Sequence, residues 1–139
     1  MKSSSLTITA LNKGLLDITQ QIKENLTQNL DLKEESGLLN LFIQHTSCAL
    51  TINEAYDPLA ANDLGEFLEH LAPTNLTFIK HTDEGPDDSP SHMKALITGH
   101  SLTIPVFKGH LQLGRWQGIF LCEFRDTPRP RTILSSFIS

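Results

Sequence analysis

Three of the six histidines lie where side chains distant in the sequence can share a metal ion. His45 follows an apolar stretch that predicts a buried strand, His81 opens an acidic loop, and His92 begins a predicted helix. A zinc ion binds neutral imidazole nitrogens at about 2.0–2.1 Å, and three protein ligands with water in the fourth position are its catalytic arrangement. These three histidines are therefore our predicted metal ligands.

Acidic residues separate two of the predicted ligands. Glu84, Asp87 and Asp88 lie between His81 and His92. Carboxylates at such positions complete a metal shell, orient an imidazole or move a proton. The spacing matches neither a His-Glu-x-x-His signature nor a cysteine-pair motif, and a lone histidine near a strand end is more often structural. The pattern alone leaves both metal binding and a structural role open.

Other polar residues have a functional and a structural interpretation. Thr46 and Ser47 either donate hydrogen bonds to a substrate phosphate or a ligand histidine, or satisfy the backbone where a strand ends. Lys94 suits phosphate binding, as do Arg115, Arg129 and Arg131, although such side chains are more often solvated surface charges. No Gly-x-Ser-x-Gly turn surrounds Ser47, so we expect no serine nucleophile. Glu123 lies in an apolar stretch and, if buried, needs a partner such as a C-terminal arginine.

The composition excludes several classes of protein. The 139 residues fit one domain, and 39% hydrophobic with 19% charged residues is typical of a globular chain. A net charge of −5 disfavours a nucleic-acid partner, because phosphate binding needs a basic face. No bilayer-spanning run or signal peptide is recognisable, so we expect no membrane partner and a cytoplasmic location. Cys48 and Cys122 are then expected to be buried free thiols.

The hydrophobic pattern predicts an α+β fold with largely antiparallel sheets and two to three helices, in a single domain over residues 1–139. Strands are predicted over residues 6–10, 38–44, 49–52, 76–80, 102–107, 111–113, 119–124 and 132–138, with a tight turn at 108–109. The first predicted helix runs from Leu15 to the polar stretch at Asp31. The second covers residues 58–71, with Asp57 as its N-cap. The third covers residues 90–96, with Ser89 as its N-cap and Gly99 at its end.

Several motifs, in order along the chain, resemble those of one known family. They are Gln44-His45-Thr46-Ser47, Leu50 to Glu54, Asp57-Pro58, His81 through Ser91-His92-Met93-Lys94, and Trp116-Gln117-Gly118-Ile119 with Glu123. Together they cover nearly the whole chain and are similar to the YjbQ family. The resemblance implies a small sandwich-like α+β fold, a homotrimer and a metal site built around histidines.

The resemblance also implies which residues form the site. The family's histidine positions are matched by His45, His81 and His92, and its polar site positions by Glu84, Asn53 and Glu54. With one carboxylate added from the acidic loop, the predicted catalytic residues are Glu84, Asp88, Asn53 and Glu54. The predicted substrate-binding residues are Thr46, Ser47, Lys94 and Arg115. Of these, Arg115 replaces a residue that is usually small and polar in the family, which would change the anion that the site accepts.

The activity implied by the resemblance is that of a secondary thiamine-phosphate synthase, which couples hydroxymethylpyrimidine diphosphate with thiazole phosphate. The departing pyrophosphate is usually assisted by magnesium, which prefers oxygen ligands, whereas histidines favour zinc or a similar ion. Metal-dependent hydrolysis of a small phosphorylated or acyl substrate suits the predicted ligands better. A third alternative is a non-catalytic trimeric binding module. A structural metal whose coordination shell is filled by four ligands, with no position open to water, would indicate this role.

Overall fold

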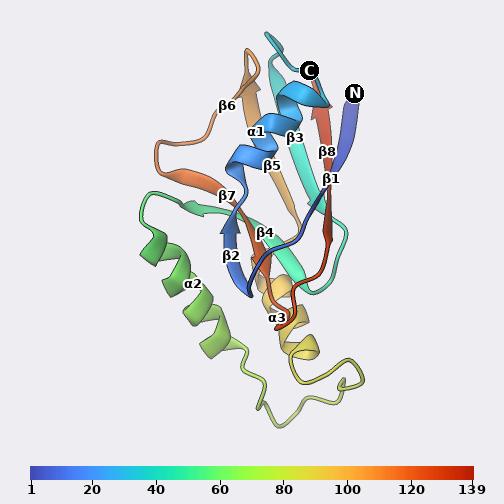
Figure 1. Cartoon of the computed structure of the whole chain (residues 1–139), viewed down its shortest axis with the longest axis vertical. Coiled ribbons are helices and arrows are strands. Elements are labelled where there is room, and N and C mark those ends of the chain that lie inside the picture. Colours follow the sequence, from blue (N-terminus) through green and yellow to red (C-terminus); the bar gives the residue numbers. More distant parts are fainter.

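The computed structural model describes all 139 residues and consists of two antiparallel sheets and three helices (Figure 1). The strands are β1 (Lys2–Ile8), β2 (Gly14–Asp17), β3 (Gly37–Ile43), β4 (Cys48–Glu54), β5 (Ser101–Phe107), β6 (His110–Leu111), β7 (Gln117–Glu123) and β8 (Arg131–Ile138). The helices are α1 (Thr19–Gln28), α2 (Pro58–Leu71) and α3 (Asp88–Thr98). The predicted α+β fold with antiparallel pairing is confirmed.

The two sheets enclose the main core between them. The larger sheet has the strand order β1-β8-β3-β5-β6 and the smaller has β2-β7-β4, with every neighbouring pair antiparallel. Alternate residues of both sheets, such as Leu41 and Leu121, are buried in one cluster with Ile22 and Leu26 of α1. Burial of this apolar surface is the main favourable term in the folding free energy.

Helices α2 and α3 cover the other face of the smaller sheet. A second apolar cluster forms there from Ala49, Cys122 and Phe124 with Leu68 of α2, and Ala95 of α3 packs against it. Both cysteines are buried and free, as predicted, and burial raises the pKa of each thiol to about 12. The acidic segment that links the two helices lies at the bottom of Figure 1, so the N-terminus of α3 lies at that end of the molecule.

The first predicted helix begins too early. Leu15 and Leu16 instead belong to β2, which pairs with β7. Helix α1 starts only at Thr19, after Ile18 has donated its backbone N–H to the carbonyl oxygen of Ile119. The prediction was wrong because the helical spacing of apolar residues does not reveal that a partner strand is available.

The predicted strand over residues 76–80 is also wrong. The backbone N–H of Ile79 donates to the carbonyl oxygen of Leu76, which forms a turn, and no strand lies beside the segment. A short apolar run becomes a strand only where a neighbouring strand satisfies its backbone groups. This segment instead carries the chain from α2 to the acidic loop.

Helix α3 begins two residues before the predicted start. Its N-cap is Asp87 and its first residue is Asp88, whereas the sequence favours Ser89 as cap and Pro90 as first residue. The side chain of Asp87 makes no capping hydrogen bond because it binds elsewhere, so the usual signal of a cap is missing. His92 therefore lies one turn into the helix and not in its first turn.

The other turn and cap signals are confirmed. The Asp57 carboxylate accepts a hydrogen bond from the backbone N–H of Leu59, and α2 begins at Pro58. Lys108 and Gly109 have φ values of 49° and 78°, which a two-residue hairpin turn requires. No helix combines the length and the apolar character that are needed to cross a membrane.

A buried ion pair joins the two sheets. Glu123 of β7 and Arg131 of β8 are 0% and 2% exposed, and both Nε and Nη2 of the arginine donate to the carboxylate. The backbone N–H groups of Arg125 and Arg129 also donate to it. Burial by itself would raise the pKa of Glu123, but these hydrogen bonds lower it below its ordinary value. The predicted arginine partner of Glu123 is confirmed.

Replacing Glu123 by Gln is expected to lower the free energy of unfolding by roughly 3–5 kcal/mol, because Arg131 stays buried without its counter-charge. In the wild type the lowered pKa of Glu123 means that the unfolded state binds more protons below about pH 4.3, so stability is lost as the pH falls. The variant lacks this contribution and should lose less stability on acidification. Denaturant unfolding followed by circular dichroism at neutral and acidic pH measures both effects.

The control for this experiment is Glu24→Gln, which removes an exposed carboxylate from α1. It should leave the unfolding free energy at neutral pH nearly unchanged. An unfolding free energy of E123Q that falls with pH in parallel with the wild type would contradict the prediction.

Candidate metal centre

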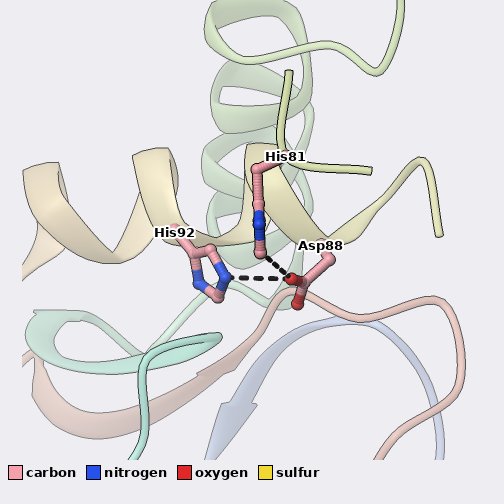
Figure 2. Close-up of side chains that lie close together, drawn as sticks. All are labelled: His81, Asp88 and His92. Atoms are coloured by element: carbon pink, nitrogen blue, oxygen red, sulfur yellow. Dashed lines mark hydrogen bonds and ion pairs between the residues drawn. The ribbon is translucent and has the colours of Figure 1, made fainter. Parts of the chain in front are cut away.

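The rings of His81 and His92 converge on one carboxylate oxygen. The Nε2 atom of His81 lies 2.9 Å, and that of His92 lies 3.0 Å, from Oδ2 of Asp88. Figure 2 shows both side chains directed at this oxygen. The three potential ligand atoms lie within 4.8 Å of one another, and no other trio of His, Cys, Asp or Glu in the chain does so.

The early start of α3 brings these residues together. Asp88 is the first residue of the helix and His92 lies four residues later, so both side chains are on the same helix face. His81 comes from the segment before the helix, and its ring centre lies 5.5 Å from that of His92. The first turn of a helix also favours a negative charge, which stabilises the Asp88 carboxylate there.

Thr46 determines which nitrogen of His92 carries a proton. Nδ1 of His92 lies 2.6 Å from the carbonyl oxygen of Thr46, which can only accept a hydrogen bond, so Nδ1 is the donor. A neutral His92 then has a bare lone pair on Nε2, the atom that faces the Asp88 carboxylate. Two acceptors 3.0 Å apart require a proton or a cation between them. The geometry therefore fits an imidazolium or a bound metal ion.

Arg125 holds the Asp88 carboxylate from the other side. Its Nη1 donates to Oδ1 of Asp88 at 2.7 Å, its Nε donates to Asp87 at 2.9 Å, and its Nη2 donates to the backbone oxygen of Glu84. Burial would raise the pKa of Asp88, but the hydrogen bond from His81 and the charges of His92 and Arg125 lower it. The carboxylate is therefore ionised, and only Oδ2 is left for the two histidines.

One side of the cluster faces solvent. The Asp88 side chain is 6% exposed, whereas those of His92 and His81 are 35% and 55% exposed. The residues present fit a divalent metal ion, because two imidazole nitrogens and one carboxylate oxygen are a common ligand set for such ions. An ion held by these three atoms would keep a position open towards solvent, which is the arrangement of catalytic sites.

His45, the third predicted ligand, lies outside this cluster within one chain. Its Nε2 accepts a hydrogen bond from the backbone N–H of Thr132 at 2.8 Å. Burial, together with the charge of Arg131, lowers the pKa of His45 and favours the neutral ring. The place beside His81 and His92 is taken by Asp88, which the sequence indicates as a catalytic residue. The role of His45 as a ligand stays a prediction.

The predicted residues of the acidic loop and of α3 differ in where they lie. Glu84 is exposed, and its backbone is tied to the cluster through Arg125. Lys94 is only 1% exposed and turns away from the histidines, because its Nζ donates to Glu69 of α2. Burial lowers the pKa of Lys94, although Glu69 opposes the shift. Lys94 therefore has a structural partner, and its predicted contact with substrate is untested.

Three predicted residues lie at the far end of the smaller sheet. Strand β4 spans roughly 20 Å from Cys48 to Glu54, so Asn53 and Glu54 are well separated from the histidines in one chain. Their side chains serve local turns, since Asn53 accepts from the Glu54 backbone and Glu54 accepts from the Asp57 backbone. Arg115 precedes β7 near the same end, because Gln117 pairs with Glu54. Their catalytic and substrate-binding roles stay predictions.

Sequence reasoning missed the role of Arg125. A basic residue directly after an apolar strand is the one signal that pointed to it, since a buried charge there needs a partner. The partners come from a loop 37 and 38 residues away in the sequence. That distance explains why no local pattern connects Arg125 with the two aspartates.

Comparison with known proteins covers nearly the entire chain. A family model described as UPF0047 protein YjbQ-like matches residues 4–139. The chain belongs to the YjbQ family. It is 41% identical to the UPF0047 protein YjbQ of Escherichia coli O157:H7, over 95% of this chain and 94% of that protein. The family resemblance seen in the motifs is therefore confirmed.

Solved structures agree with the fold. A conserved hypothetical protein from Thermus thermophilus superimposes with a TM-score of 0.84 at 37% identity, over 97% of this chain and 99% of that one. A YjbQ/UPF0047 protein from Clostridium acetobutylicum gives a TM-score of 0.84 at 32% identity, with the same coverage. The two-sheet arrangement is thus shared within the YjbQ family.

Replacing Arg125 by Lys is expected to weaken zinc binding by about 10–100-fold, because an ammonium group keeps the charge but cannot hold both aspartates in the fork geometry of a guanidinium. Isothermal titration calorimetry of metal-free protein measures the affinity, and circular dichroism verifies the fold. Arg115→Lys is the matched control at the far end of the sheet. Equal zinc affinities for R125K and the wild type would show that Arg125 does not position Asp88.

Proposed function

We propose that this chain binds a divalent transition-metal ion, with zinc preferred, through His81, Asp88 and His92, and uses it to hydrolyse a small phosphorylated or acyl substrate. One observation carries the proposal: the Nε2 atoms of both histidines converge on a carboxylate oxygen whose partner oxygen is already held by Arg125. Two nitrogen ligands favour zinc or a related ion over magnesium, which prefers oxygen.

A bound zinc ion would supply a Lewis acid that polarises a phosphoryl or carbonyl oxygen and activates water. The protein supplies the orientation. Thr46 keeps the Nδ1 proton of His92 in place, and Arg125 keeps the Asp88 carboxylate in one rotation. Glu84 is our candidate for moving a proton, because it is exposed, lies four residues before Asp88 and is tied to Arg125 through its backbone.

The thiamine-phosphate synthase activity implied by the resemblance is a less favoured form of the same proposal. It requires stabilisation of a departing pyrophosphate, for which magnesium with oxygen ligands is usual. The predicted catalytic residues Asn53 and Glu54 also lie far from the histidines in one chain. We therefore place hydrolysis first and test the transferase reaction beside it.

The test compares zinc binding and turnover in matched variants. Asp88→Asn and His92→Ala are expected to lower zinc affinity by at least about 100-fold, since the first replaces a charged carboxylate by a neutral amide and the second removes an imidazole nitrogen. Glu84→Gln should keep its zinc but lower kcat by about 10²-fold or more. Calorimetry with metal-free, untagged protein gives the affinities. Release of nitrophenolate from p-nitrophenyl phosphate and p-nitrophenyl acetate gives the rates, and formation of thiamine phosphate tests the transferase.

His70→Ala is the control, because this histidine is exposed on α2 and lies outside the cluster. Zinc affinity that is absent in the wild type, or equal in D88N and the wild type, would refute the metal site. Zinc binding without turnover of either ester, in a protein whose fold depends on zinc, would support the structural metal instead.

We propose further that copies of the chain form a homotrimer through the outer face of the larger sheet. Leu38, Phe42, Phe107 and Ile138 are 49%, 39%, 56% and 58% exposed, and the strand register puts all four on this face. The accessible surface is 8084 Å², compared with about 7,200 Å² expected for a compact monomer of this mass. Exposed apolar patches of this kind mark association surfaces.

Leu38→Glu combined with Ile138→Glu is expected to convert the trimer into a monomer, because the two side chains are direct neighbours on that face and burying their charges in an interface is costly. Sedimentation velocity should give about three times the chain mass of 15.5 kDa for the wild type and the chain mass for the variant. Leu59→Glu, a similarly exposed apolar position on α2, is the control. A monomeric wild type would contradict the assembly.

A further inference from the structure

A small polar pocket lies between two segments that are distant in the sequence. It has a volume of about 360 Å³, and none of its lining residues is hydrophobic or acidic. The lining residues are Gln44, His45, Thr46, Ser47, Arg129, Pro130 and Arg131. Apart from Pro130, the lining side chains are neutral polar or basic, so the pocket offers an anion hydrogen-bond donors and no acidic side chain, in a chain of net charge −5.

Ser47 supplies an unused hydrogen-bonding group in this pocket. The residue is only 6% exposed, and its backbone oxygen accepts from Arg131, but its hydroxyl has no partner within the chain. Every fully buried side-chain nitrogen or oxygen atom of the chain has a hydrogen-bond partner, so this hydroxyl keeps some accessible surface, and Ser47 is a lining residue of the pocket. A nearly buried hydroxyl that is left free at a pocket wall favours a ligand there.

The two arginines of the pocket differ in exposure and in ion pairing. Arg131 is buried and neutralised by Glu123. The guanidinium of Arg129 is exposed and has no carboxylate within ion-pair distance, although its backbone N–H donates to Glu123. Its five N–H donors are therefore available, and their fork geometry suits the oxygens of a phosphate or carboxylate.

His45 adds a neutral donor. Because its Nε2 accepts the Thr132 backbone N–H, the proton of the neutral ring must be on Nδ1. The pocket thus contains a cation, a hydroxyl and an imidazole N–H, which together can satisfy several oxygens of one anion. No acidic side chain lines the pocket to oppose an anion.

A largely apolar groove lies next to this pocket and has one histidine of the cluster in its wall. It has a volume of about 830 Å³ and shares Gln44, His45 and Thr46 with the polar pocket. Ala95 and Leu96 of α3 are among its apolar lining residues, and His92 lies in its wall. A ligand that occupies both spaces would pass beside the candidate metal centre.

We propose that the polar pocket binds the phosphate group of a small phosphate monoester whose apolar body lies in the adjoining groove. Phosphate fits better than carboxylate because it offers more acceptor oxygens to the donors of Ser47, His45 and Arg129. This is the usual plan of small-molecule sites, in which a few polar groups orient a largely apolar ligand. Its assignment as the substrate rests on the proposed function, whereas its binding does not require metal.

Calorimetric titration of metal-free protein with phenyl phosphate, inorganic phosphate and phenol tests the two parts of the site. Phenyl phosphate should bind at least about tenfold more tightly than either fragment, since it uses both spaces. Arg129→Gln should weaken binding of phenyl phosphate and of inorganic phosphate by about tenfold, and Ser47→Ala should weaken both by a smaller factor. Leu96→Asn should weaken binding of phenyl phosphate alone.

Lys23→Gln, which removes an exposed cation from α1 outside every predicted site, is the control and should bind phenyl phosphate like the wild type. The proposal is overturned if R129Q and S47A also bind like the wild type, or if the loss occurs in K23Q. Zinc titration of R129Q separates the two proposals, because its zinc affinity should be unchanged. Phosphate binding that depends on Arg129 in a chain that binds no zinc would refute the metal centre and leave this site standing.

Discussion

The fork of Arg125 is the contact on which the candidate site depends. One guanidinium binds Asp87, Asp88 and the backbone of Glu84, so the acidic segment is held against the end of β7. Without a cation there, two buried carboxylates would repel each other at the start of α3. With it, Asp88 keeps one oxygen directed at the two histidines. The segment that follows α2 has no strand partner, and the Arg125 guanidinium binds it at Glu84 and Asp87.

Buried charge at the end of β7 therefore serves both the fold and the site. Glu123 pairs with Arg131 across the two sheets, and Arg125, two residues later, pairs with the acidic segment. Buried ion pairs are weak evidence for stability, because desolvation opposes the Coulomb attraction. Their effect here is positional: each pair joins elements that share no backbone hydrogen bonds. Arg125 contacts the candidate metal centre, and Arg131 lines the polar pocket.

Features that depend on neighbouring residues were predicted correctly from the sequence. Features that depend on partners distant in the sequence were not. The cap at Asp57, the turn at residues 108–109 and the antiparallel strands follow from short-range chemistry and periodicity. The helix expected from Leu15 gave way to pairing with β7, which no window of neighbouring residues reveals. Of the predicted ligands, His81 and His92 lie together in the cluster. The carboxylate of the cluster, Asp88, was predicted as a catalytic residue. The contact between Arg125 and Asp88 was not predicted.

The turn over residues 44–47 links the two parts of the site. The Thr46 carbonyl determines the protonated nitrogen of His92, and the Ser47 carbonyl accepts from Arg131, so one short segment contacts both the candidate metal centre and the inter-sheet ion pair. A ligand bound to Ser47 and Arg129 would contact the same segment that orients His92. Binding of anion and metal should therefore be coupled, and linkage requires each to change the affinity for the other by the same factor. Asn53, roughly 20 Å away along β4, cannot take part in this coupling within one chain.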